Sequence, residues 1–341
     1  MFNYKNYKKI TTTLLLSISL LAITNVVKAA GVSDRPDVQQ FINHMVKTYH
    51  FNKTELQHLF QQVNIDRRVL PSIKAPMEAV PWYRYKTFFL TPKRIQEGAQ
   101  FWQQNTATLA EAEHRYGVPA SIIVAILGVE SNYGSSQGKF KVIDSLTTLS
   151  FEYPKRAKFF RSELEQFLLL TREQHFNPLE IRGSYAGAMG QGQFMPSSYR
   201  SYAVDFTGDG KKDLFHNTAD AIGSVANYMK RHGWYAAQPV ALEAYSKTSA
   251  TKLNTNFSYS QRKPTMLPLS QIKRYGLYTK QKLPSDIQAS IIKLEGAQGM
   301  EYWLGFHNFN VIMRYNPSAR YAMAVYQLGE AVKATTPQRQ S

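Results

Sequence analysis

Over most of the first two thirds of the chain, hydrophobic positions repeat with a helical period. Apolar residues recur three and four positions apart from residue 36 to residue 116, a spacing that places them on one face of a helix. Asn52 predicts an N-cap within this region. Thr91 followed by Pro92 predicts the start of a further helix, which Gly117 would end.

The same period continues beyond Gly117. A helix is expected from Pro119 to Gly134, and a second one over residues 155–174. Residues 183–213 are dense in glycine and predict a loop-rich region. Thr218 then predicts the cap of a helix that Gly233 ends.

From residue 238 to residue 300 the pattern changes to short alternating pieces rich in Ser, Thr, Lys and Tyr, which predict a small strand-rich insertion. The helical period returns at residues 316–318. The expected fold class is therefore α+β and predominantly helical. The domain division that follows is a segment over 1–29, a helical domain with the start of the core over 30–117, a core over 118–237, the β-rich insertion over 238–300, and a return to the core over 301–341.

The first residues have the composition of a secretory signal peptide. A basic stretch up to Lys9 precedes an apolar run over 14–23 and a small-residue cleavage site at 27–29. The run is shorter than the roughly 20 apolar residues of a membrane span, and no later stretch is long enough. We expect an exported, periplasmic protein that is soluble after cleavage near Ala30.

Composition narrows the possible functions. The chain has no cysteine, which excludes disulfides, a Cys-ligated metal, a thiol nucleophile and a lipid-modified cysteine. The net charge is +17, and removal of four signal-segment lysines leaves 17 − 4 = +13. This charge favours attraction to an anionic surface such as the cell wall. Nucleic acid is the competing interpretation, against which the export signal argues; the charge could also serve only solubility.

One carboxylate stands out within an apolar run. Ile123, Ile126, Leu127 and Glu130 are spaced i, i+3, i+4 and i+7, so Glu130 is the last position of one apolar helix face. Apolar surroundings disfavour the anion, so we expect a raised pKa, which suits a general acid. The alternative is that Glu130 faces water, or pairs with a cation, at a frayed helix end.

The glycine-dense segment, residues 183–198, supplies neutral polar groups. Ser184 and Gln193 offer a hydroxyl and an amide among aromatic and apolar residues, a combination that suits sugar recognition. Tight helix packing is an equally good explanation of the glycines. A second carboxylate, which glycosidases normally need, is not evident, because Asp144 and Glu152 lack a comparable setting.

Residues 205–216 match the spacing of an EF-hand calcium loop, with oxygen ligands at positions 1, 3 and 5, glycine at position 6 and a backbone carbonyl at position 7. Position 12 is His216 instead of glutamate, so Asp220 would have to close the site. The alternative is an Asp/Gly turn in which Asp220 serves only the helix dipole. The expected ligands are Asp205, Thr207, Asp209, Lys211 through its carbonyl, and Asp220.

Five motifs in the same order resemble the lytic transglycosylase B family of bacterial peptidoglycan-cleaving enzymes. They are E-S-N-Y-G at Glu130, G-x-x-A-G-A-M-G-x-x-Q-F-M-P-S at Gly183, D-F-T-G-D-G at Asp205, A-D-A-I-G-S-V-A-N-Y at Ala219 and R-Y-N-x-S-x-x-Y-A-M at Arg314. The resemblance covers nearly all of the mature chain. It implies a lysozyme-like core with an added helical domain and a small β domain.

The resemblance also implies an activity. Such enzymes cleave the MurNAc-β-1,4-GlcNAc bond of peptidoglycan with one glutamate as acid and base, assisted by the substrate's N-acetyl group, and form a 1,6-anhydro-MurNAc end. Glu130 is the corresponding glutamate, Ser184 and Gln193 would hold substrate or orient it, and structural calcium is the only cofactor expected, without an organic cofactor. The sugar subsites would be lined by Tyr85, Tyr228, Tyr315, Asn316 and Tyr321.

Several alternatives stay open at this point. Asn316, which precedes Pro317, could instead be a helix start, and Tyr228 could be a core residue. The protein could be a noncatalytic, calcium-stabilised wall-binding protein or a lysozyme-type hydrolase. The family's named member is a lipoprotein, and membrane anchoring is not expected without a cysteine. We expect a monomer whose partners are glycan strands and wall-remodelling proteins.

Overall fold

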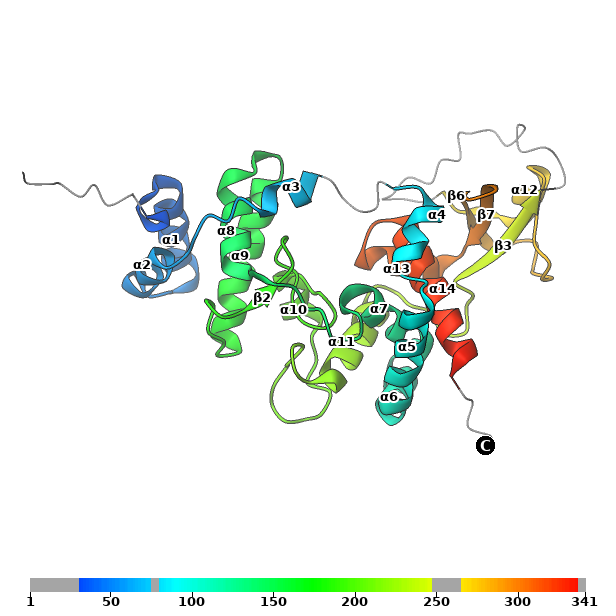
Figure 1. Cartoon of the computed structure of the whole chain (residues 1–341), viewed down its shortest axis with the longest axis horizontal. Helices are drawn as coiled ribbons and strands as arrows, with labels where there is room; N and C mark the ends of the chain where they lie inside the picture. The colour runs from blue at the N-terminus through cyan, green and yellow to red at the C-terminus, as the bar shows by residue number, and fades with distance from the viewer. Residues whose placement is uncertain (1–30, 75–79, 247–264, 337–341) are drawn as a thin grey trace, which may run out of the picture.

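The computed structural model describes residues 31–74, 80–246 and 265–336, and its helices and one small sheet follow one another along the long axis (Figure 1). The predicted signal segment, residues 1–29, lies outside the described residues. The predicted fold class, α+β and predominantly helical, is confirmed.

One end of the molecule is formed by the first helices and by a long helical pair, α8 against α9 (Figure 1). Asn52 caps α2 as predicted, because its Oδ1 accepts hydrogen bonds from Thr54 N and Glu55 N. The predicted helix over 155–174 corresponds to α9, whereas α8 was not predicted. The bounds are α1 Pro36–Tyr49, α2 Lys53–Gln61, α3 Val69–Lys74, α8 Val142–Glu152 and α9 Ala157–Glu173.

The helix expected from Thr91 to Gly117 is two helices. Thr91 is an N-cap, as predicted, and accepts from Arg94 N. The helix breaks at Asn105, whose side chain donates to Phe101 O and so competes with the backbone hydrogen bonds. Gly117, at φ 69°, ends the second helix as predicted. The bounds are α4 Trp82–Tyr85, α5 Pro92–Gln104 and α6 Thr106–Tyr116.

Helix α7 (Ala120–Ser131) is the centre of the fold. Every residue from Ala120 to Gly128 is buried, because α5, α6, α11 and α14 contact the helix on all sides. The expected single apolar face was therefore too narrow a description. The helix also ends three residues before the predicted Gly134, since Asn132 and Tyr133 adopt the left-handed conformation with φ of 50° and 57°.

The glycine-dense region contains a short helix that was not predicted, α10 (Pro196–Tyr202). It precedes α11 (Thr218–Arg231), whose N-cap is Asn217 rather than the predicted Thr218. Asn217 Oδ1 accepts from Ala219 N and Asp220 N, which fixes the first turn. A two-residue ribbon, β1 (Phe140–Lys141) with β2 (Arg182–Gly183), joins this region to the residues after α7.

The predicted strand-rich insertion is a five-stranded antiparallel sheet in the order β4-β6-β7-β3-β5, at the far end of the molecule from α1 (Figure 1). It has its own small core around Ile272 and Leu304. Its last strand continues beyond residue 300, and the domain division itself remains a prediction. The bounds are β3 Ala241–Ser246, β4 Leu267–Pro268, α12 Leu269–Arg274, β5 Leu277–Tyr278, β6 Gln288–Gly296 and β7 Gly299–Gly305.

Two helices return the chain from the sheet to α7. They are α13 (His307–Tyr315) and α14 (Ala319–Thr335), and α14 packs against both α5 and α7. Ser318 caps α14 by accepting from Tyr321 N. The interpretation of Asn316 as a helix start is therefore wrong, because Ser318 takes that position.

The close packing of Tyr133 on α7 gives a test of the fold. A Cβ on Gly128 would lie 2.7 Å from atoms of the Tyr133 ring, so we expect Gly128→Ala to lower the free energy of unfolding by about 1–3 kcal/mol. In a Tyr133→Ala background the same change should be neutral or stabilising, because alanine favours the helix once the space is open. Urea denaturation of the native protein, the two single variants and the double variant gives the change in the free energy of unfolding in each background. An equal loss of stability in both backgrounds would contradict the packing of Tyr133 on Gly128.

Candidate functional site

Glu130 lies at the C-terminal end of α7, where the buried helix reaches the surface. It is half-buried, whereas the next residue, Ser131, is 1% exposed. The Ser131 hydroxyl donates to Gln191 O at 2.6 Å and accepts from Gly134 N at 2.8 Å. The backbone that carries Glu130 is thus fixed against a neighbouring loop immediately after the carboxylate.

Tyr321 supplies a direct partner for the carboxylate. Its hydroxyl donates to Glu130 Oε1 at 2.6 Å, although 191 residues separate the two. Tyr321 lies in the first turn of α14, which Ser318 caps, and its ring is 2% exposed. Burial and the charge of Glu130 raise the pKa of Tyr321 well above its ordinary value, so its hydroxyl stays protonated as a donor.

Three further tyrosines from the predicted set gather around this pair. Burial, followed by the charge of Glu130, raises the pKa of Tyr315, and burial also raises that of Tyr228, with Glu130 adding to it. The rings of these two residues meet edge to face at 4.7 Å. Tyr85 is close enough that its ionised form would also raise the pKa of Tyr321. The structure therefore brings together four tyrosines and one carboxylate from distant parts of the chain.

The four tyrosines differ in exposure. Tyr85 and Tyr228 are 1% and 7% exposed, and the Tyr228 hydroxyl donates to Arg314 O. Tyr315 is half-buried, and its hydroxyl donates to Gly192 O in the glycine-dense segment. Burial of Tyr228 agrees with a core residue, whereas Tyr315 keeps part of its surface exposed. The subsite roles of these residues remain predictions.

Ser184, Gln193 and Asn316 are half-buried. Ser184 Oγ accepts from the backbone N–H groups of residues 186 and 188. Gln193, in the left-handed region at φ 49°, donates through Nε2 to Gln137 O and Gly190 O. Ser184 and Gln193 therefore hold the shape of the glycine-dense segment, and the expectation that they orient Glu130 remains a prediction.

The predicted calcium loop forms a closed turn around Asp205. Its Oδ1 accepts from Gly208 N and Asp209 N, and its Oδ2 accepts from Gly210 N. Desolvation opposes the effect, but these N–H groups hold the pKa of Asp205 below its ordinary value. Thr207 Oγ1 lies 3.4 Å from Asp205 Oδ1, so two of the predicted ligands point to the same place.

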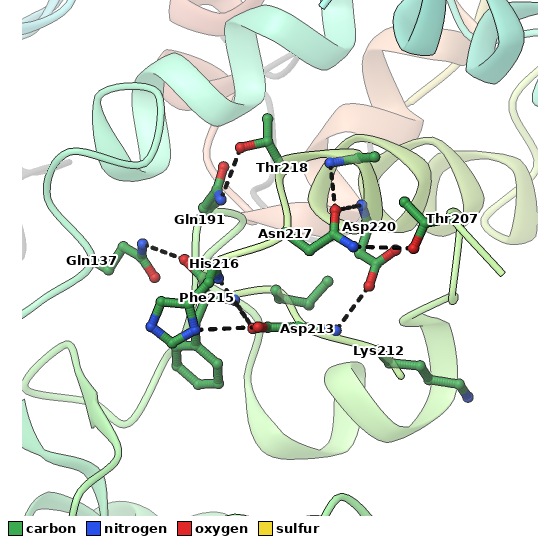
Figure 2. A network of polar contacts seen from close by, with 12 residues as sticks. Gln137, Gln191, Thr207, Lys212, Asp213, Phe215, His216, Asn217, Thr218 and Asp220 are labelled. Atoms are coloured by element: carbon green, nitrogen blue, oxygen red, sulfur yellow. Dashed lines mark hydrogen bonds and ion pairs between the residues drawn. The ribbon is translucent and has the colours of Figure 1, made fainter. Parts of the chain in front are cut away.

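Asp220 is a buried residue that hydrogen-bonds to both ends of the 205–213 segment. It is fully buried, and one of its oxygens accepts from Phe206 N at 2.8 Å. The other accepts from Asp213 N at 2.9 Å (Figure 2). Desolvation raises its pKa against these hydrogen bonds. Asn217 adds a link by donating to Thr207 Oγ1.

The donor set of the loop fits calcium in its chemistry, since every predicted ligand is an oxygen at EF-hand spacing. The side chains are nevertheless turned toward backbone N–H groups. In the part of the chain that the structure describes, no three Asp, Glu or His residues are grouped so as to hold a metal ion. The match between this loop and a calcium site therefore depends on the types of its residues and on their order in the loop.

Two site residues were missed from the sequence. Gln137 donates to Phe215 O and Gln191 donates to Thr218 Oγ1, both in the C-terminal half of the calcium-type loop (Figure 2). Gln191 is only 5% exposed, whereas glutamine side chains are mostly exposed in proteins. Only its place inside the glycine-dense motif could have indicated it, and nothing in the sequence indicated Gln137.

None of the described helices is long and apolar enough to cross a membrane.

Comparison with known proteins identifies relatives over most of the chain. A family model described as a transglycosylase SLT domain matches residues 33–330. The membrane-bound lytic murein transglycosylase B of Escherichia coli (strain K12) is 44% identical over 319 residues, which are 90% of this chain and 86% of that protein.

Solved structures give the same result. The Escherichia coli lytic transglycosylase Slt35 in complex with calcium has a TM-score of 0.82 at 44% identity, covering 89% of this chain and 95% of that chain. SltB3 from Pseudomonas aeruginosa in complex with NAG-anhNAM-pentapeptide has a TM-score of 0.74 at 34% identity, covering 87% and 79%.

These matches extend through the N-terminal helices, α7, the calcium-type loop and the sheet. They confirm the resemblance that the five motifs indicated, and with it the class of enzyme. The chain belongs to the lytic transglycosylase B family of bacterial peptidoglycan-cleaving enzymes.

Proposed function

We propose that this lytic murein transglycosylase uses Glu130 as its single acid and base. The observation that carries the proposal is the hydrogen bond from Tyr321 to Glu130 at the end of a buried helix. The C-terminal end of a helix carries a partial negative charge, which disfavours a carboxylate anion there. Half-burial acts in the same direction, and a carboxyl group in such a setting suits proton donation to a substrate.

In the proposed reaction the Glu130 carboxyl donates its proton to the glycosidic oxygen as the bond from that oxygen to the MurNAc C1 breaks. The N-acetyl group of the substrate stabilises the positive C1. The Glu130 carboxylate then takes the proton of the 6-hydroxyl as this oxygen bonds to C1 and closes the 1,6-anhydro ring. The proton returns to Glu130, and no water enters the reaction. Tyr321 stabilises the anionic stage by donating to it.

The two other carboxylates considered from the sequence are held by other contacts. Asp144 is 8% exposed and accepts from Asn64 N, and Glu152 pairs with Arg35. Both lie on α8, and neither is free to act as a nucleophile. This supports a reaction with one carboxylate over a lysozyme-type hydrolysis with two.

For the glycan strand we propose that Tyr315, Asn316, Ser184 and Gln193 contact sugars, because each keeps part of its surface exposed. Tyr85, Tyr228 and Tyr321 are buried and suit the support of Glu130 and the subsite walls. SltB3 was crystallised with NAG-anhNAM-pentapeptide, which supports a peptidoglycan strand as the substrate of this chain. We further propose a periplasmic location, from the predicted signal segment.

Calcium is proposed as a structural ion. Asp205, Thr207, Asp209, the Lys211 carbonyl and Asp220 would hold it, and bound calcium would cross-link the 205–220 loop. Support comes from the oxygen-only donor set and from the relative Slt35, which was crystallised with calcium.

Replacement of Glu130 tests the catalytic role. We expect Glu130→Gln to lower anhydromuropeptide release from purified sacculi by about 10²–10⁴-fold, because the amide cannot exchange the proton, while sacculus binding and thermal stability persist. Glu111→Gln, an exposed control, should leave release unchanged. Mass spectrometry of the products decides: reducing ends would indicate a hydrolase, and no release by the native protein would indicate a wall-binding protein.

Replacement of Tyr321 tests the hydrogen bond. We expect Tyr321→Phe to lower the rate by about 10- to 100-fold, since a hydrogen bond to a charged group contributes about 1.5–3 kcal/mol. Loss of the donor destabilises the anion, so the alkaline limb of the pH–rate profile should move to higher pH. Tyr83→Phe is a matched exposed control. An unchanged profile in Tyr321→Phe would count against the hydrogen bond.

Calcium binding is tested by thermal melts in chelator and in excess calcium. Calcium at about 100 times its Kd should stabilise the native protein by about 2.7 kcal/mol, and the midpoint should rise. Asp209→Ala, which removes the oxygen ligand, should abolish the rise, whereas Asp286→Ala, at an exposed position before β6, should keep it. The site is disproved if the native midpoint is the same in both solutions.

A further inference from the structure

Residues 213–218, in the C-terminal half of the calcium-type loop, are hydrogen-bonded to the chain after Glu130 and to the glycine-dense segment. On one side, Gln137 Nε2 donates to Phe215 O at 2.8 Å (Figure 2). The same nitrogen donates to Gly134 O at 3.2 Å. On the other side, Gln191 N donates to Leu214 O at 2.8 Å. Residues 213–218 therefore contact the chain just after Glu130 and the glycine-dense segment at the same time.

Gln191 joins these contacts to the residue next to Glu130. Its carbonyl accepts from Ser131 Oγ at 2.6 Å, and its side chain donates to Thr218 Oγ1 at 3.3 Å. The side chain lies against Gly134, which has φ of 86° and on which a Cβ would meet Gln191 Oε1 at 3.1 Å. A single buried glutamine thus spans from the first residue of α11 to the last residue of α7.

On the loop side, the same residues are hydrogen-bonded to Asp220 and Asp213. Asp220 holds Asp213 N, and Asp213 Oδ1 in turn accepts from Phe215 N at 2.9 Å and His216 N at 3.1 Å (Figure 2). These bonds fix the direction of the Phe215 carbonyl that Gln137 binds. A change in the loop would therefore alter the position of the Phe215 carbonyl, to which Gln137 donates.

The opposite side of the α7 end is held by separate contacts. The Tyr133 hydroxyl donates to Arg94 O at 2.9 Å, and Arg94 Nη1 donates to Gly128 O at 3.2 Å. Those contacts come from α5. The glutamine contacts link the loop to the residues that follow the carboxylate.

We propose that Gln137 and Gln191 are positioning residues that couple the conformation of the 205–220 loop to Glu130. The proposal rests on the proposed role of Glu130 as acid and base. Gln137 acts by joining Phe215 to Gly134, and Gln191 acts by joining Thr218, through its side chain, to Ser131, through its backbone carbonyl. Misplacement of a catalytic group by about 1 Å can lower a rate about 100-fold, so small loop changes have a measurable effect.

The test uses Gln137→Met and Gln191→Met in the full-length protein, which keep side-chain size and remove the amide. We expect each to lower anhydromuropeptide release from sacculi about 10-fold and to displace the pH–rate profile, because the surroundings of Glu130 change. Gln104→Met, on the exposed end of α5, is the control. Partial unfolding of a variant would lower the rate without shifting the pH–rate profile. Thermal melts of each variant measure any such loss of stability.

The coupling is tested from the loop side with Asn217→Ala, which removes the cap of α11 and the bond to Thr207. Its effect on the rate should be clearly smaller in the Gln137→Met/Gln191→Met background than in the native protein. The proposal is overturned if Asn217→Ala lowers the rate by the same factor in both backgrounds. It is also overturned if Gln137→Met and Gln191→Met keep the native rate and pH–rate profile, as Gln104→Met should. If Glu130→Gln stays active, both the proposed function and this inference fail. If Glu130→Gln is inactive but the glutamine and Asn217 variants give the contrary results above, only the coupling between the loop and Glu130 is disproved.

Discussion

A carboxylate at the C-terminal end of a helix buried on all sides is the constraint around which this structure is arranged. The helix dipole and the apolar packing of α7 both oppose the anion of Glu130. The fold supplies a neutral hydroxyl donor, because Tyr321 donates a hydrogen bond to Glu130 Oε1. This donor stabilises the anion that remains once Glu130 has given up its proton.

Placing that hydroxyl requires long-range topology. Tyr321 reaches Glu130 because the chain passes through the β-rich sheet and returns as α13 and α14, which packs against α7. The glycine-dense segment and the loop held by Asp220 close the other side, through Ser131 and Gln191. The small sheet has its own core, so its strands contribute to the site mainly by bringing α14 back.

Local signals in the sequence predicted much of this arrangement. The N-caps at Asn52 and Thr91, the turn of Gly117 and the strand-rich insertion depend on short-range patterns and are confirmed. The break at Asn105 and the all-round burial of α7 were missed, because the first depends on side-chain competition for backbone carbonyls and the second on tertiary packing. Glu130 was selected from its spacing. The family resemblance predicted Tyr321 only as a sugar-subsite residue, and its hydrogen bond to Glu130 was not predicted.

The central claim is that one carboxylate completes the reaction without water. It is tested most directly by digesting sacculi in water labelled with heavy oxygen and weighing the released fragments. The account predicts that the sugar ends formed by cleavage carry no label and have the mass of an anhydro sugar. Incorporation of one labelled oxygen at each cleaved bond would contradict it.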